Sequence, residues 1–158
     1  MIQIISATPR DASDIERLLS RVYVAAGFTD AAVASELFRG DSVLGRGEVL
    51  VARESEKLAG MVIVVPPDSE ARKLAEAGDA EMHLLAVAPE YRMVGLGGRL
   101  VEASLDKARF LGFERMILWT QPVMAAAQRL YVRHGFVRVE ARDFERAGRS
   151  FLVFEREL

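Results

Sequence analysis

The sequence predicts one domain of the α/β or α+β class over residues 1–158. Segments with a helical spacing of apolar residues alternate with short segments rich in valine, leucine and isoleucine. A chain of this length suits one domain and is long enough to bury a hydrophobic core without a metal ion or a disulfide.

The first half of the chain is predicted to contain a strand, two helices and a hairpin. Residues 2–6 are apolar enough for a strand, and apolar residues then recur three and four positions apart after Pro9, which predicts a helix. A second helix is predicted over 31–39, ended by the glycine that follows it. Two apolar segments over 48–53 and 58–65 flank a short polar turn, which is the pattern of a hairpin.

The second half is predicted to contain further strands and helices, most of them bounded by glycine or proline. The strands are expected over 81–88, 115–120, 136–141 and 150–155, and the helices over 95–111 and 122–133. Residues 84–87 are continuously apolar, as expected for a strand buried on both faces. Residues 151–154 are also apolar at successive positions, which a sheet interior and a homodimer contact explain equally well.

The composition excludes several classes of function. The chain has no cysteine, which excludes disulfides, cysteine nucleophiles and thiolate metal sites and is compatible with a cytoplasmic protein. The net charge of -2 gives no sign of the basic face of a nucleic-acid-binding protein. The N-terminus lacks the basic flank of a signal peptide, and the apolar run at 61–67 is far shorter than the roughly 20 residues of a membrane helix. We therefore expect no metal ion, nucleic acid or membrane as a partner.

Three closely spaced glycines, Gly95, Gly97 and Gly98, fall between a predicted strand and a predicted helix. The first N–H groups of a helix lack partners within it and point outward at the positive end of the helix dipole. Glycine lets a phosphate approach these groups closely. A Walker loop would need lysine and then serine or threonine after the last glycine, and a dinucleotide fingerprint would need glycine in place of Leu100. Both nucleotide motifs are therefore excluded.

The remaining pattern is R-x-x-G-x-G, formed by Arg92, Gly95 and Gly97. It resembles the pyrophosphate-binding turn of the GNAT superfamily of acyl-CoA-dependent N-acetyltransferases. The stretch LLAVAPEYRMVGLGGRLVEA resembles the central motif of that family, and AQRLYVRHGF resembles its later motif A-x-x-L-Y-x-x-x-G-F. The opening IISATPRDASDIERLLS resembles its first strand and helix, so the similarity covers nearly the whole chain in the family's order.

The resemblance implies the GNAT fold, a central mixed and mostly antiparallel sheet of about seven strands flanked by about four helices. It also implies acetyl-CoA as the cosubstrate. The strand residues Leu85, Ala86 and Val87 are expected to pair with the pantetheine arm as an added strand would, and an N–H near Val87 to polarise the thioester carbonyl. The turn expected to hold the diphosphate consists of Arg92, Met93, Val94, Gly95, Leu96, Gly97 and Gly98.

Acetyl transfer to an amine needs two proton transfers. The attacking amine must be neutral, so a base accepts a proton, and the departing thiolate needs a proton from an acid. By resemblance Tyr131 is the expected acid, with a buried aromatic residue on an amphipathic helix as the alternative. Glu81 and His83 lie two positions apart on one predicted strand and so face the same side.

The identity of the base stays open between these two residues. Glu81 matches the position of a catalytic glutamate in some family members, and a solvent-exposed carboxylate at a strand end is the alternative. His83 titrates near neutral pH and is the second candidate, with a hydrogen-bonded structural histidine as the alternative. His134 lies at a predicted helix end, where a structural role is expected.

Two positions depart from the family pattern. Met124 stands where many members carry an asparagine that binds the pantetheine arm, so that hydrogen bond is absent or supplied elsewhere. Trp119 stands where some relatives carry a glutamate base.

The resemblance places the acceptor site near the first two helices, the loop between them and the closing strands. Tyr23, Phe28 and Phe38 lie in the first region, either as pocket or as core residues. Asp30 and Asp41 are carboxylates able to attract an ammonium group. No specific acceptor follows from these residues.

Three functions remain open from the sequence. The first is an acetyltransferase that acts on a small-molecule amine, and the second is one that acts on a protein or peptide, at an N-terminus or a lysine. The third is a non-catalytic CoA-binding regulatory module. A closed pocket would favour the first and a cleft open at both ends the second, whereas CoA binding without turnover on any amine would favour the third.

Overall fold

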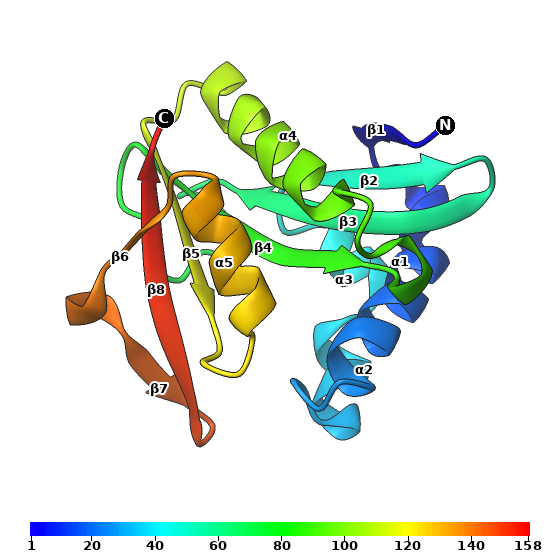
Figure 1. Cartoon of the computed structure of the whole chain (residues 1–158), viewed down its shortest axis with the longest axis horizontal. Helices are drawn as coiled ribbons and strands as arrows, with labels where there is room; N and C mark the ends of the chain where they lie inside the picture. The colour runs from blue at the N-terminus through cyan, green and yellow to red at the C-terminus, as the bar shows by residue number, and fades with distance from the viewer.

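A mixed sheet of eight strands runs through the protein, and helices cover both of its faces (Figure 1). The structure is a computed structural model that describes residues 1–158. The strands are β1 (Gln3–Ser6), β2 (Glu48–Glu54), β3 (Lys57–Val65), β4 (Asp79–Val87), β5 (Arg115–Thr120), β6 (Val137–Arg138), β7 (Phe144–Arg146) and β8 (Arg149–Glu157). The helices are α1 (Ala12–Leu19), α2 (Ala31–Leu37), α3 (Gly40–Leu44), α4 (Leu96–Phe110) and α5 (Ala125–Arg133). None of them combines the length and the apolar character needed to cross a membrane.

The strand order along the sheet is β1-β2-β3-β4-β5-β8-β6, and β7 pairs with β8. Every neighbouring pair is antiparallel except β4 and β5, which run parallel. The expectation of a mixed, mostly antiparallel sheet is therefore confirmed. The strand expected over 136–141 is reduced to the short β6, and the separate β7 pairs with β8 through a turn at Ala147 and Gly148.

Side chains of the central strands alternate between the two faces of the sheet and supply two hydrophobic cores. On β3, Val62 and Val64 face the core that includes α4 and α5, whereas Met61 and Ile63 face the core that includes α1, α2 and α3. Full burial of each such side chain stabilises the fold by about 1.5–3 kcal/mol. β8 lies between β5 and β6 with Val153 fully buried, so the sheet interior accounts for the apolar tail.

The parallel pair β4–β5 is joined only at its beginning. Residues 79–81 pair with residues 115–117, and beyond them β4 continues along β3 while β5 continues along β8. The pairing of β4 with β3 is irregular next to Leu84, whose φ of 52° lies in the left-handed region. Such a conformation costs of the order of 1–3 kcal/mol in a residue other than glycine, and it occurs preferentially at functional sites. The two strands diverge from this point (Figure 1), so the edge of β4 that faces β5 is left without a strand partner.

Two helix boundaries differ from the sequence prediction. Gly40 does not end α2 but begins α3, and it is glycine because a Cβ there would lie 2.1 Å from the Ala12 carbonyl oxygen. Helix α5 begins at Ala125 and not at Pro122, because a hydrogen-bonded turn that ends at Met124 precedes it. In both cases a tertiary or turn contact overrides a rule that depends on the local sequence alone.

Candidate active site

The turn between β4 and α4 presents a run of unpaired backbone N–H groups. Gly95 directly precedes α4 with a φ of 79°, a conformation that suits glycine, and Met93 adopts a φ of 68°. The N–H groups of residues 93–98 donate to no backbone acceptor, because they belong to the turn and to the first turn of the helix. The Arg92 side chain beside them is exposed and forms no ion pair. This geometry is able to bind an anion.

The other two glycines of the turn have a packing role that the sequence did not reveal. A Cβ on Gly97 would lie 3.2 Å from Leu130 of α5, and a Cβ on Gly98 would lie 3.0 Å from the ring of His134. His134 Nδ1 in turn lies 2.6 Å from Glu102 of α4. The small residues therefore let α5 approach the start of α4 closely, and His134 has the expected structural role.

The end of β4 offers an open backbone edge beside this turn. Ala88 donates a hydrogen bond to a carbonyl of β3 at 2.8 Å, so the N–H of Val87, one residue earlier, points to the opposite edge. The Leu85 carbonyl accepts a hydrogen bond from the Tyr23 hydroxyl at 2.9 Å. Ala86 between them is buried against the helices of the other face.

A cavity of about 260 Å³ lies where β4 and β5 diverge. Its walls come from α2 and the segment that leads into it, from β4 and β5, from the β7–β8 hairpin, from α5 and from the connections that precede β2 and β4. Tyr23, Phe28 and Phe38 all line it. Phe38 is also a core residue with only 1% of its surface exposed, so the pocket and core interpretations both apply to it.

Tyr131 lines this cavity from α5. Its ring packs against Phe136 and Phe154, with ring centroids 5.8 and 6.3 Å away. Its hydroxyl forms no hydrogen bond within the protein and is open to the cavity. Burial raises the pKa of Tyr131 above its ordinary value, so the phenol stays protonated and able to donate.

Glu81 and His83 form a buried pair at the base of the cavity. His83 Nε2 lies 2.7 Å from Glu81 Oε1, which confirms that the two side chains face the same side of β4. The other carboxylate oxygen accepts hydrogen bonds from the N–H groups of Lys73, Leu74 and Ala75, at 2.8, 2.5 and 2.6 Å. His83 lines the cavity, whereas Glu81 is fully buried behind it. A solvent-exposed carboxylate at this strand end is therefore excluded.

The charge states of this pair follow from its surroundings. Burial alone would raise the pKa of Glu81, but the hydrogen bonds from His83 and the backbone hold it below its ordinary value, so Glu81 is ionised. Burial lowers the pKa of His83 despite the Glu81 carboxylate, and the charges of Arg46 and Lys73 lower it further. A neutral imidazole that faces a carboxylate through Nε2 carries its proton there. The lone pair is then on Nδ1, which has no hydrogen-bond partner in the protein.

The two departures from the family pattern both lie on the cavity wall. The Trp119 ring meets the His83 ring edge to face, with centroids 4.9 Å apart. Met124 lines the cavity and its sulfur accepts a hydrogen bond from the Thr120 hydroxyl at 3.2 Å. Trp119, at the position of the glutamate base of some relatives, therefore packs against His83.

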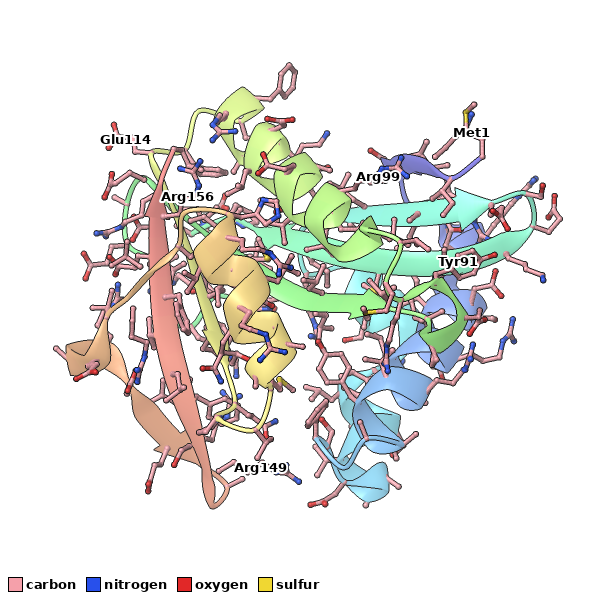
Figure 2. All side chains as sticks on the ribbon, in the orientation of Figure 1. Met1, Tyr91, Arg99, Glu114, Arg149 and Arg156 are labelled. Carbon is pink, nitrogen blue, oxygen red and sulfur yellow. The ribbon has the colours of Figure 1, made fainter.

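The two carboxylates considered for an ammonium group are both paired with arginine. Asp41 lies outside the cavity and pairs with Arg39 at 3.1 Å, which removes it from the candidates. Asp30 lines the cavity but pairs with Arg149 at 3.6 Å. Figure 2 shows Arg149 at the lower end of β8, close to the segment that leads into α2, where it also hydrogen-bonds Gln121 at 3.1 Å.

Three further cations, Arg46, Lys73 and Arg146, line the cavity without having been predicted. Each comes from a connection or a strand end, where no periodicity marks a residue as facing a site. No group of three or more histidine, aspartate or glutamate side chains is arranged to hold a metal ion.

Comparison with known proteins agrees with this geometry. The model of the acetyltransferase (GNAT) family matches residues 12–136. The uncharacterized N-acetyltransferase YjhQ of Escherichia coli (strain K12) is 29% identical over 129 residues, which are 80% of this chain and 64% of that protein. The chain thus spans slightly less than two thirds of the length of this curated relative.

Solved structures share the whole fold at low sequence identity. The GNAT-family acetyltransferase of Staphylococcus aureus Mu50 superposes with a TM-score of 0.79 at 14% identity, covering 100% of this chain and 99% of that one. The PaiA N-acetyltransferase of Thermoplasma acidophilum, in complex with coenzyme A, gives 0.78 at 15% identity over 100% and 99% of the two chains. A GNAT acetyltransferase of Elizabethkingia anophelis with acetyl-CoA bound gives 0.68 at 19% identity over 99% and 98%.

The expected fold is confirmed by these likenesses, and the family match extends over most of the chain. The protein belongs to the GNAT family of acetyltransferases.

Proposed function

We propose that the protein transfers the acetyl group of acetyl-CoA to a primary amine of a small molecule, by direct attack of the amine on the thioester. The observation that carries this proposal is the cavity of about 260 Å³ in which His83 and Tyr131 are both open to the same space. A cavity of this size suits a small acceptor, whereas a protein chain would need a groove open at both ends. The paired Glu81 and His83 beside a free phenol favour catalysis over a purely regulatory module.

Acetyl-CoA supplies the activated acetyl group, and two features of the chain fit it. The unpaired N–H groups of residues 93–98 fit a diphosphate, and the exposed Arg92 adds a positive charge beside them. The open edge of β4 over residues 85–87 fits the amide groups of a pantetheine arm, which would add as a strand. The relatives from Thermoplasma acidophilum and Elizabethkingia anophelis hold coenzyme A and acetyl-CoA. The N–H of Val87, which points to this edge, is our candidate donor to the thioester carbonyl.

His83 is the proposed base and Glu81 its positioning residue. A primary ammonium group has a pKa of about 10, so it loses one proton to solvent before attack, and its nitrogen must lose a second proton as the bond to the carbonyl carbon forms. Nδ1 of His83 has the free lone pair to accept that proton, and the ionised Glu81 would stabilise the resulting imidazolium. Glu81 itself is a poorer candidate, because its oxygens already accept hydrogen bonds from His83 and from the backbone of residues 73–75.

Tyr131 is the proposed acid. When the new bond forms between the amine nitrogen and the carbonyl carbon, the carbon–sulfur bond breaks and the sulfur needs a proton. The Tyr131 hydroxyl is open to the cavity and stays protonated at neutral pH, so it is able to give that proton. After the products leave, His83 gives its extra proton to solvent and Tyr131 takes one back from solvent.

An assay of thiol release tests this function. The protein is incubated with acetyl-CoA and a panel of primary amines, and the acetylated product is identified by mass spectrometry. We expect thiol release that depends on a small amine. Preferred acetylation of peptide N-termini or lysines would assign the protein to the second class, and binding of CoA without turnover on any amine would assign it to the regulatory class.

A further inference from the structure

We propose that the amine acceptor also carries an anionic group, a carboxylate or a phosphate monoester, held by Arg46, Lys73 and Arg146 in the cavity. This inference rests on the proposed acetyl transfer and names its substrate class. It starts from an imbalance of charge: these cations line one small cavity, and no acidic side chain pairs with any of them.

The three cations come from separate parts of the chain. Arg46 lies in the α3–β2 connection, Lys73 in the β3–β4 connection and Arg146 at the end of β7. Arg46 donates to the Leu37 carbonyl, and Arg146 lies over two phenylalanine rings of the β7–β8 hairpin at 5.9 and 5.5 Å. Both contacts hold a guanidinium at the wall without neutralising its charge.

The charges of these groups act on one another. Burial lowers the pKa of Lys73, and the positive charges of Arg146 and Arg46 lower it further. The Glu81 carboxylate acts in the opposite direction and raises the pKa of Lys73, but it forms no ion pair with the lysine, and its oxygens already accept hydrogen bonds from His83 and from backbone N–H groups. Like charges that converge on a cavity repel one another, and an anion that binds among them relieves the repulsion.

Other parts of the molecule do not account for these cations. No residue of the 92–98 turn lines this cavity, so they are not placed to neutralise a diphosphate bound at that turn. Asp30, the only carboxylate on the wall, is already paired with Arg149, and its side chain is 79% exposed. The three cations therefore outnumber the one ionised carboxylate behind the wall, Glu81, which favours an anion over a second ammonium group.

The position of the cations relative to His83 suits a molecule with both groups. Arg46 and Lys73 are near enough to lower the pKa of His83, so an anion held by them would lie within the same small space as Nδ1. The amine of the same molecule would then be directed at the base. Guanidinium groups bind carboxylates and phosphates through paired hydrogen bonds, which also orients the ligand.

Matched pairs of acceptors test the inference. One arm compares ω-amino carboxylates of increasing chain length with their neutral amides, and the other compares O-phosphoethanolamine with ethanolamine, all by thiol release with acetyl-CoA. We expect kcat/KM to be about ten- to hundredfold higher for the anionic member of at least one arm, the size of a hydrogen-bonded charge contact. The arm with the larger ratio identifies the carboxylate or the phosphate as the natural group.

Substitutions separate charge recognition from general damage. Lys73→Met and Arg146→Met should each lower kcat/KM for the anionic acceptor about tenfold or more, without lowering it for the neutral partner. Lys107→Met is the control, because it removes a charge from α4 that does not line the cavity. Equal kcat/KM within every pair, or equal losses for both members in the variants, would overturn the proposal.

A binding measurement keeps the inference distinct from the proposed function. The same acceptor pairs are titrated calorimetrically into the CoA-loaded protein. Tighter binding of the anionic member that is lost in Lys73→Met supports the anion site even if no amine is acetylated, a result that would overturn only the proposed acetyl transfer. Equal binding of both members, or equal binding by wild type and Lys73→Met, would overturn the anion site itself.

Discussion

Replacing Glu81 by glutamine tests the proposed base sharply, because it removes a charge without changing the size of the side chain. Oε1 of Glu81 lies 2.7 Å from His83 Nε2, and Oε2 accepts hydrogen bonds from the N–H groups of Leu74 and Ala75 at 2.5 and 2.6 Å. Glutamine has one acceptor oxygen and one NH₂ group. With the oxygen toward the backbone N–H groups, the NH₂ group faces His83 and donates to Nε2.

The substitution would therefore move the histidine proton to Nδ1. Nδ1 would then lack the lone pair that accepts the proton of the attacking amine. We expect kcat to fall by roughly 10²–10⁴-fold. The KM for acetyl-CoA should change little, since no residue of the 92–98 turn is altered. Weaker hydrogen bonds to a neutral side chain should lower the free energy of unfolding by roughly 2–4 kcal/mol. The free energy of unfolding of a typical domain is about 5–15 kcal/mol, so we expect Glu81→Gln to remain folded.

Three measurements and one control complete the test. Thiol release gives kcat, ¹⁵N NMR of the imidazole gives the tautomer of His83, and urea unfolding gives the stability. Glu102→Gln is the matched control, because Glu102 pairs with the other histidine, His134, at 2.6 Å and lies outside the cavity. We expect the control to keep the wild-type kcat. A folded Glu81→Gln protein with kcat within about twofold of wild type would refute the base assignment.

Three further predictions concern Tyr131, Gly95 and the ion pair of Asp79 with Arg115. Tyr131→Phe should lower kcat about 10²–10⁴-fold in the thiol-release assay while calorimetry finds an unchanged Kd for coenzyme A; equal turnover would remove the acid role. Gly95→Ala should weaken coenzyme A binding about tenfold, because alanine at the φ of 79° costs about 1–2 kcal/mol, whereas Gly112→Ala at 87°, at the far end of α4, should be equally strained without affecting binding. Burial would raise the pKa of Asp79, but Arg115 at 2.9 Å and a backbone N–H hold it below its ordinary value. The ionised pair therefore stabilises the fold above about pH 4, and this stability is lost as the pH falls through the lower folded-state pKa. In urea unfolding, Asp79→Asn should lower the free energy of unfolding by about 3–5 kcal/mol at pH 7, and the variant should lose less stability than the wild type as the pH falls below about 4; an unchanged pH profile would contradict this assignment.

The parts of the site that obey local rules could be predicted from the sequence. Helix α4 follows Gly95 and ends just before Gly112, and both glycines have the positive φ that makes glycine informative. Glu81 and His83 share a face because side chains alternate along a strand. Which of the two faces the cavity could not be predicted. Glu81 is buried and His83 is left open to the cavity because the loop at residues 73–75 covers the Glu81 carboxylate.

The parts that depend on tertiary convergence could not be predicted. Arg46, Lys73 and Arg146 lie far apart in the sequence, and an arginine or lysine in a loop is most often a solvated surface residue. The left-handed Leu84 was equally hidden, because it lies within an apolar run that predicts a regular strand. Its unusual backbone lies where β4 leaves β5, and so it belongs to the opening of the cavity.

The central claim is that the turn before α4 and the adjoining cavity form one site for acetyl-CoA and its acceptor. A crystal structure of the protein with coenzyme A tests this claim most directly. We expect the diphosphate on the N–H groups of residues 93–98 and the sulfur in the cavity, next to the Tyr131 hydroxyl. A diphosphate bound to any other surface, or a sulfur that lies outside the cavity, would contradict it.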